Sequence, residues 1–222
     1  MYYFLLIAVM IFVAWAQMSV KTTFAKYTKV ATLHGQTGYD AARCILDANG
    51  LHHVRIEQVK GELTDHYSPK EQVIRLSDPV YGVASAAAVG VAAHEAGHAV
   101  QNAVGYFPMK LRTMIIPVTQ FGSSAAIPLF LMGLVFSFGF LVDLGLALFF
   151  FSVLFQLVTL PVEFNASNRA MAALRQSGAY SEEELKSARK VLTAAAMTYV
   201  GALAVALVQF LRLLAMANSR RR

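Results

Sequence analysis

Cysteine and charged residues are both scarce in this sequence. Cys44 is the single cysteine among 222 residues, so no disulfide can form within the chain and a cysteine-rich zinc module is excluded. Any metal site must therefore use histidine, aspartate and glutamate side chains. Charged residues make up only 14% of the chain, whereas 57% of it is hydrophobic. This composition fits an ordinary soluble domain poorly and favours a membrane protein.

Basic residues outnumber acidic ones and give a formal net charge of +6. They lie beside long apolar runs, however, and form no basic stripe interleaved with aromatic residues. We therefore expect a lipid bilayer as partner and no nucleic acid. In this setting the lysines and arginines indicate the orientation of the chain in the membrane.

Residues 1–20 are predicted to form a first transmembrane helix. The chain has no charged residue from Tyr2 to Val20, and ~20 apolar residues match one bilayer crossing. No basic segment precedes this run and no small-residue cleavage site ends it, so we expect a span and not a signal peptide. The residues that follow include Lys21, Lys26 and Lys29. By the positive-inside rule, these lysines place the next segment in the cytoplasm.

Residues 113–160 are predicted to form a transmembrane hairpin. Asp143 is the only charged residue of this apolar block, which has about twice the length that one helix needs. The reversal is expected near Ser137 to Asp143, where a glycine and an acid would be tolerated at the far interface. A hairpin returns the chain to the side that it left, so residues 161–190 are predicted to be cytoplasmic.

Residues 191–216 are predicted to form a fourth transmembrane helix or a helix packed on the membrane. They are apolar and rich in alanine, but they include Arg212. A basic tail, residues 217–222, follows. If the helix crosses completely, this tail lies outside, against the positive-inside rule; a tilted or partly immersed helix would remove the conflict.

Residues 21–112 have a more ordinary composition and are predicted to form a cytoplasmic domain. A short helix is expected between an N-cap at Thr37 and a stop at Gly50. Short apolar runs between His53 and Leu76 predict two or three strands. A helix rich in alanine is expected from Ser85 to Val104. The predicted fold class is a mainly α membrane protein with about four transmembrane helices and a small α+β cytoplasmic insert.

That last helix contains His94-Glu95-Ala96-Gly97-His98, an H-E-x-x-H motif. The spacing puts both imidazoles on one helix face, where His94 and His98 can bind one Zn²⁺. Glu95 would then act as the general base in peptide hydrolysis. A solvated helix face is the alternative, but the apolar neighbours of the motif indicate a buried helix, in which charged groups need partners.

A zinc peptidase requires a third protein ligand, and Glu163 is the strongest candidate. The predicted hairpin brings it back to the side of the membrane that carries His94 and His98. Glu163 could instead be an interfacial acid beside a bend imposed by Pro161. Other candidates for the third ligand are His66, Asp65 and Asp78.

These residues resemble the YugP-type membrane zinc metallopeptidases, a bacterial group of neutral zinc metallopeptidases. Besides the first apolar run, the resemblance rests on three stretches: Tyr67-Ser68-Pro69 leading to Val73-Ile74-Arg75-Leu76-Ser77, His94 to Gln101, and Pro161-Val162-Glu163-Phe164-Asn165-Ala166-Ser167. It implies a multi-pass protein of the bacterial plasma membrane, in which the small α+β cytoplasmic insert is zincin-like.

The chain is more distantly similar to membrane endopeptidases of the heat-shock and prenyl-protein type. Their E-x-x-x-D pattern implies Glu163 as ligand in a gluzincin arrangement, with substrate along an edge strand near Gln72 to Leu76. Ser167 replaces the aspartate of that pattern. A serine can accept a hydrogen bond from a metal-binding histidine but supplies no charge, and Asn165 or Asn168 could serve instead.

The predicted function is that of a membrane-embedded zinc endopeptidase, acting from the cytoplasmic side on membrane or membrane-proximal polypeptides. Tyr199 is a candidate donor to the oxyanion, although an aromatic residue in a membrane helix commonly serves packing. Two alternatives remain open. One is a metal-binding membrane scaffold without turnover. The other is an intramembrane protease of the site-2 type, in which Asp143 would be the third ligand.

Overall fold

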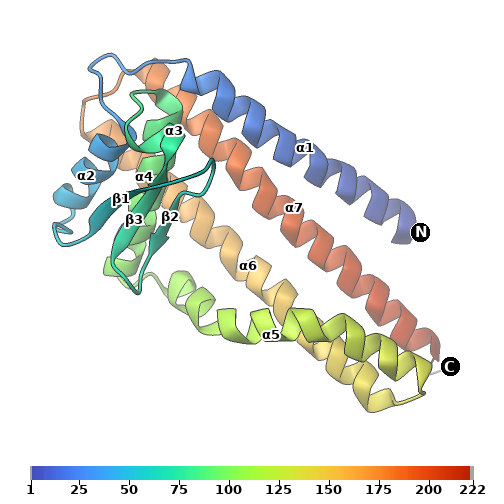
Figure 1. Cartoon of the computed structure of the whole chain (residues 1–222). Helices are drawn as coiled ribbons and strands as arrows, with labels where there is room; N and C mark the ends of the chain where they lie inside the picture. The colour runs from blue at the N-terminus through green and yellow to red at the C-terminus, as the bar shows by residue number, and fades with distance from the viewer. Residues whose placement is uncertain (1, 221–222) are drawn as a thin grey trace. The chain divides into compact units, whose positions relative to one another are not determined.

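The computed structural model of the chain describes residues 2–220, which form two compact units. One, here called the helical unit, contains the described residues up to Trp15, Phe107–Pro161 and the described residues from Thr198 onward. The other, here called the mixed unit, contains Ala16–Tyr106 and Val162–Met197. Figure 1 shows the helices and strands in chain order.

Four helices among the described residues are long and apolar enough to cross a membrane. Their bounds are α1 Tyr2–Thr28, α5 Phe107–Val135, α6 Gly139–Gln176 and α7 Glu182–Arg220. They form from the apolar runs of the sequence, because a helix satisfies its own backbone hydrogen bonds where water is absent. The prediction of about four such helices is confirmed. Arg221 and Arg222 of the predicted basic tail lie outside the described residues.

All four of these helices extend beyond the predicted spans. The first helix continues to Thr28, since neither proline nor glycine interrupts the chain before Gly35. Pro161 lies inside α6, so the segment that contains Glu163 continues the second helix of the hairpin. A proline removes one backbone hydrogen bond, a loss that long apolar helices tolerate when neighbouring groups compensate.

In the helical unit, α5 and α6 form the predicted hairpin. The reversal lies at residues 136–138, where Ser137 has a φ of 62°. The two backbones touch at Gly145, because a Cβ atom added there would lie 2.7 Å from the carbonyl oxygen of Ala126. An apolar cluster in this unit consists of the buried residues Phe130, Val142, Leu213 and Ala217.

The mixed unit contains a three-stranded sheet of β1 (Arg55–Val59), β2 (His66–Ser68) and β3 (Val73–Ser77). The strand order is β1-β3-β2, with β1 parallel and β2 antiparallel to β3. The expected two or three short strands are therefore confirmed. The expectation of a substrate-binding edge near Gln72 to Leu76 is wrong, because β3 is the central strand and pairs on both sides.

Three shorter helices complete the mixed unit: α2 Gly38–Ala48, α3 Asp78–Tyr81 and α4 Ala86–Ala103. The predicted N-cap of α2 is confirmed, since Thr37 and Asp40 form a reciprocal capping box. The α4 helix begins after Ser85, whose hydroxyl oxygen accepts a hydrogen bond from the backbone N–H of Ala88. It ends just before Gly105, as predicted.

The α4 helix is buried along nearly its whole length, and its small residues let neighbouring helices approach closely. At Gly97 an added Cβ atom would lie 2.6 Å from the carbonyl oxygen of Ala166 on α6, whereas at Gly90 the nearest atom would be 3.2 Å away. Since Ala166 lies one turn after Glu163, this contact sets the distance between the H-E-x-x-H motif and Glu163.

We predict that Gly97→Ala destabilises the protein although alanine is the better helix former. In an open helix position this change would stabilise by about 1 kcal/mol, whereas overpacking against a backbone costs about 1–3 kcal/mol. Gly82→Ala is the control, because Gly82 has a φ of −104° and nothing within 4 Å of an added Cβ atom. Denaturant unfolding in detergent measures both. A Gly97→Ala protein at least as stable as the wild type would contradict the close contact.

Candidate metal centre

The two histidines of the motif lie one above the other on α4. Their rings are 4.7 Å apart between centroids and nearly perpendicular, at 80°. This arrangement follows from the spacing of four residues, which returns the helix to the same face after one turn. Both rings therefore point to the same side of α4.

Glu163 faces both histidines from α6. Its Oε2 atom lies 3.2 Å from Nε2 of His94 and 3.5 Å from Nε2 of His98. The side chain is almost completely buried, with 2% of its surface exposed. The structure thus brings together the three residues that the sequence predicts as metal ligands, all within the mixed unit, with candidate ligand atoms within 4.8 Å of one another.

These three side chains fit Zn²⁺. Two imidazole nitrogens and one carboxylate oxygen are a donor set of catalytic zinc sites, which leave a fourth position open. Burial lowers the pKa of His98, but the hydrogen bond with Glu163 and the negative charge of Glu95 outweigh burial and hold that pKa above its usual value. The same negative groups favour a bound cation.

The second ring nitrogen of each histidine also has a partner. Nδ1 of His94 lies 3.1 Å from the hydroxyl oxygen of Ser167, one turn after Glu163. Ser167 thus occupies the place for which the distant resemblance implies an aspartate. The substitutes considered from sequence do not take this role, because the Oδ1 atom of Asn165 faces Gln101 and Arg169, and Asn168 is exposed.

Gln101 is the partner of the other histidine, and the sequence reasoning did not identify it. Its Oε1 atom lies 2.9 Å from Nδ1 of His98, and its side chain is fully buried. A signal was present in the sequence. Gln101 follows His98 by three residues on the same helix, so the two side chains share a face.

The other residues considered as third ligand lie outside this cluster. Nδ1 of His66 faces the carbonyl oxygen of Thr64, and the Asp78 carboxylate accepts hydrogen bonds from Gln58 and Gly61. Asp65 accepts hydrogen bonds from the backbone N–H and the hydroxyl of Ser77. Burial raises the pKa of Asp65 more than these hydrogen bonds lower it.

The two proposed catalytic residues differ in their positions. Glu95 lies on α4 directly after His94 and is buried, with 8% of its surface exposed. Tyr199 lies on α7 in the helical unit and is half-buried. Asp143, the ligand in the site-2 alternative, is exposed near the start of α6 and is absent from the metal-ligand cluster found among the described residues.

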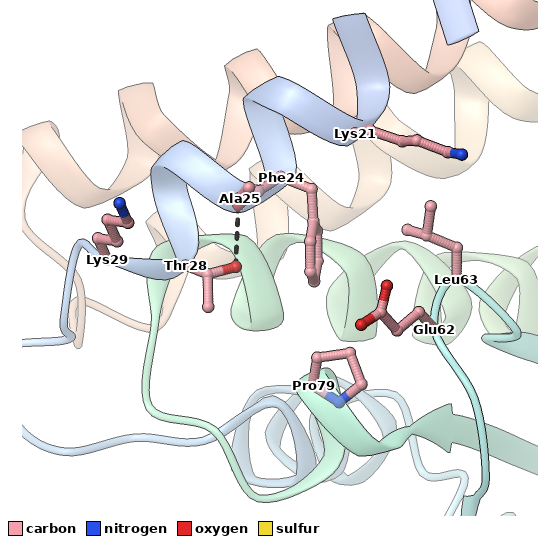
Figure 2. A pocket seen from close by; sticks show the side chains of 8 residues that line it. All are labelled: Lys21, Phe24, Ala25, Thr28, Lys29, Glu62, Leu63 and Pro79. Carbon is pink, nitrogen blue, oxygen red and sulfur yellow. Dashed lines mark hydrogen bonds between the residues drawn. The ribbon is translucent and has the colours of Figure 1, made fainter. Parts of the chain in front are cut away.

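A separate cavity of about 660 Å³ lies in the mixed unit beside α1 (Figure 2). Its lining residues are Lys21, Phe24, Ala25, Thr28, Lys29, Glu62, Leu63 and Pro79. The Phe24 ring is drawn in the middle of these side chains, with the lysines on either side. The cavity has mixed charge and contains no residue of the metal-ligand cluster.

Comparison with known proteins agrees with the donor set. Residues 2–218 match the family described as "Putative neutral zinc metallopeptidase". The chain is also similar to a protein of Bacillus subtilis (strain 168) named "Putative membrane protease YugP", with 48% identity over 212 residues, which cover 96% of this chain and 94% of that protein. No solved structure matches the chain significantly.

These matches confirm the resemblance inferred from the sequence motifs, and they confirm Zn²⁺ as the cofactor expected for such a protein. Because the family match extends over nearly the whole length, this chain belongs to the family of neutral zinc metallopeptidases.

Proposed function

We propose that the chain is a membrane-embedded endopeptidase in which His94, His98 and Glu163 bind the catalytic zinc ion. One observation carries this proposal: Nε2 atoms of both motif histidines lie within 3.5 Å of the same oxygen of a buried glutamate. Burying a carboxylate costs free energy unless a positive charge compensates it. A metal ion bound by the carboxylate and the two imidazoles would supply that charge, and it fits the family and the donor set.

When bound by His94, His98 and Glu163, Zn²⁺ would supply Lewis acidity, which polarises a peptide carbonyl and lowers the pKa of a water molecule to about 7. Glu95 would accept a proton from the attacking water as the oxygen atom of that water bonds to the carbonyl carbon. Glu95 then delivers the proton to the amide nitrogen as the C–N bond breaks. Hydrolysis of one peptide bond thus consumes one water and leaves a carboxyl group and an amine.

The oxyanion formed during this reaction needs a hydrogen-bond donor, and we propose Tyr199 for this role. Its phenol O–H can donate to an oxygen that gains negative charge. A Tyr199→Phe protein with full activity would remove Tyr199 from the mechanism.

We further propose that the protein crosses the membrane several times, with residues 21–112 and 161–190 in the cytoplasm. The support is the cluster of Lys21, Lys26 and Lys29 after the first apolar run. The substrates would then be polypeptides at or in the cytoplasmic surface of the membrane. Cys44 is exposed and is the only cysteine, so labelling it with a membrane-impermeant thiol reagent in intact cells would contradict this orientation.

Glu163→Ala is predicted to abolish stable zinc binding, while Asp143→Ala is predicted to retain it. Both acids lie on α6, but of the two only Glu163 belongs to the metal-ligand cluster found among the described residues. Loss of the hydrogen-bond partner of a metal ligand lowers metal affinity by about 10–100-fold. Loss of the ligand itself should lower zinc affinity by more than that. Metal analysis and chelator competition on the purified proteins measure this. Zinc lost only in Asp143→Ala would favour the site-2 arrangement and contradict the assigned ligands.

Glu95→Gln is predicted to lower peptidase activity by at least about 10²–10⁴-fold, because the amide cannot accept the proton of the water. Zinc content should stay unchanged, since Glu95 is not a proposed ligand. The assay is proteolysis of an unfolded protein, and chelator-treated wild type is the inactive control that gives the background rate. Full activity in Glu95→Gln would refute the mechanism. A zinc-loaded wild type without activity would favour a metal-binding scaffold.

A further inference from the structure

The two nitrogens of His98 face different kinds of group. Nε2 points to Glu163 Oε2 at 3.5 Å, and Nδ1 lies 2.9 Å from Gln101 Oε1. A neutral imidazole carries one N–H and one lone pair, and only the nitrogen with the lone pair can bind a metal. Both of these oxygens can accept an N–H, so a neutral His98 that binds a metal through Nε2 must keep its proton on Nδ1, which requires the oxygen of the Gln101 amide to face Nδ1.

The backbone of α6 fixes one end of that amide. Nε2 of Gln101 lies 2.8 Å from the carbonyl oxygen of Val162. A carbonyl oxygen can only accept a hydrogen bond, so the NH₂ end of Gln101 must face α6. The oxygen end must then face His98. Rotating the amide by half a turn would place two acceptors against each other in a fully buried position.

A second and independent constraint comes from Arg169. Nε of Arg169 donates to Oδ1 of Asn165 at 2.8 Å. A guanidinium group can only donate, so it holds the oxygen of Asn165 in place. The same Oδ1 atom accepts a hydrogen bond from Nε2 of Gln101 at 3.0 Å. The NH₂ group of Gln101 thus faces two acceptors. The α6 backbone holds the carbonyl oxygen of Val162, and Arg169 holds the Oδ1 atom of Asn165.

We propose that Gln101 is a positioning residue, held by Val162 and Asn165, that keeps the N–H of His98 on Nδ1 and directs Nε2 toward the zinc ion. The proposal rests on the proposed function of the metal centre and deepens it. His94 differs, because its partner Ser167 has a hydroxyl that can donate or accept and so imposes no tautomer. The geometry therefore assigns the fixed orientation to His98 alone.

The test is zinc affinity by chelator competition in Gln101→Met, which keeps the length of the side chain but removes its donors and acceptor. We expect affinity about 10–100-fold below wild type, the usual cost of losing the hydrogen-bond partner of a metal-binding histidine. Asn102→Met is the matched control, because Asn102 is the next residue of α4 and its amide binds the Tyr67 hydroxyl instead. Wild-type affinity in a folded Gln101→Met protein would overturn the proposal.

A measurement on the unmodified protein covers the case in which Gln101→Met does not fold. In the zinc-loaded wild type labelled with ¹⁵N-histidine, NMR should find the proton of His98 on Nδ1 and the metal on Nε2. Metal on Nδ1 would overturn the proposal. Failure of the underlying function gives a different result: Glu163→Ala would then bind zinc as tightly as the wild type.

Discussion

The site depends on one close contact between two helix backbones. At Gly97, α4 approaches α6 so closely that a methyl group would lie 2.6 Å from the carbonyl oxygen of Ala166. This approach lets a short glutamate side chain on one helix reach both histidines on the other. A larger residue at Gly97 would separate the helices, and a separation of about 1 Å at a reacting centre is sufficient to impair catalysis.

Because this contact is buried, every polar group beside it needs a hydrogen-bonding partner. Glu163 faces the histidines, Ser167 and Gln101 bind their second nitrogens, and Gln101 in turn donates to α6. Polar side chains of each helix thus contact groups on the other helix. We infer that these two helices form the rigid frame of the metal centre, because each side chain is fixed by a group on the other helix.

Much of this arrangement was predictable from sequence because it follows local rules. Helical spacing predicted His94 and His98 on one face of α4, and the predicted hairpin led us to expect Glu163 near them, as the structure has it. The order of the strands was not predictable, since local alternation does not say which strand is central, and the edge near Gln72 to Leu76 was therefore misplaced. Gln101 was missed, although it shares a helix face with His98, because a lone glutamine has no reactive group and its contacts with Val162 and Asn165 depend on the packing of α6 against α4.

The most direct test of the account is X-ray absorption spectroscopy of the zinc-loaded protein. We predict two imidazole ligands together with carboxylate or water oxygen, all at about 2.0–2.2 Å. Zinc bound by fewer than two imidazoles, or a sulfur ligand at about 2.3 Å, would contradict a metal centre made by His94, His98 and Glu163.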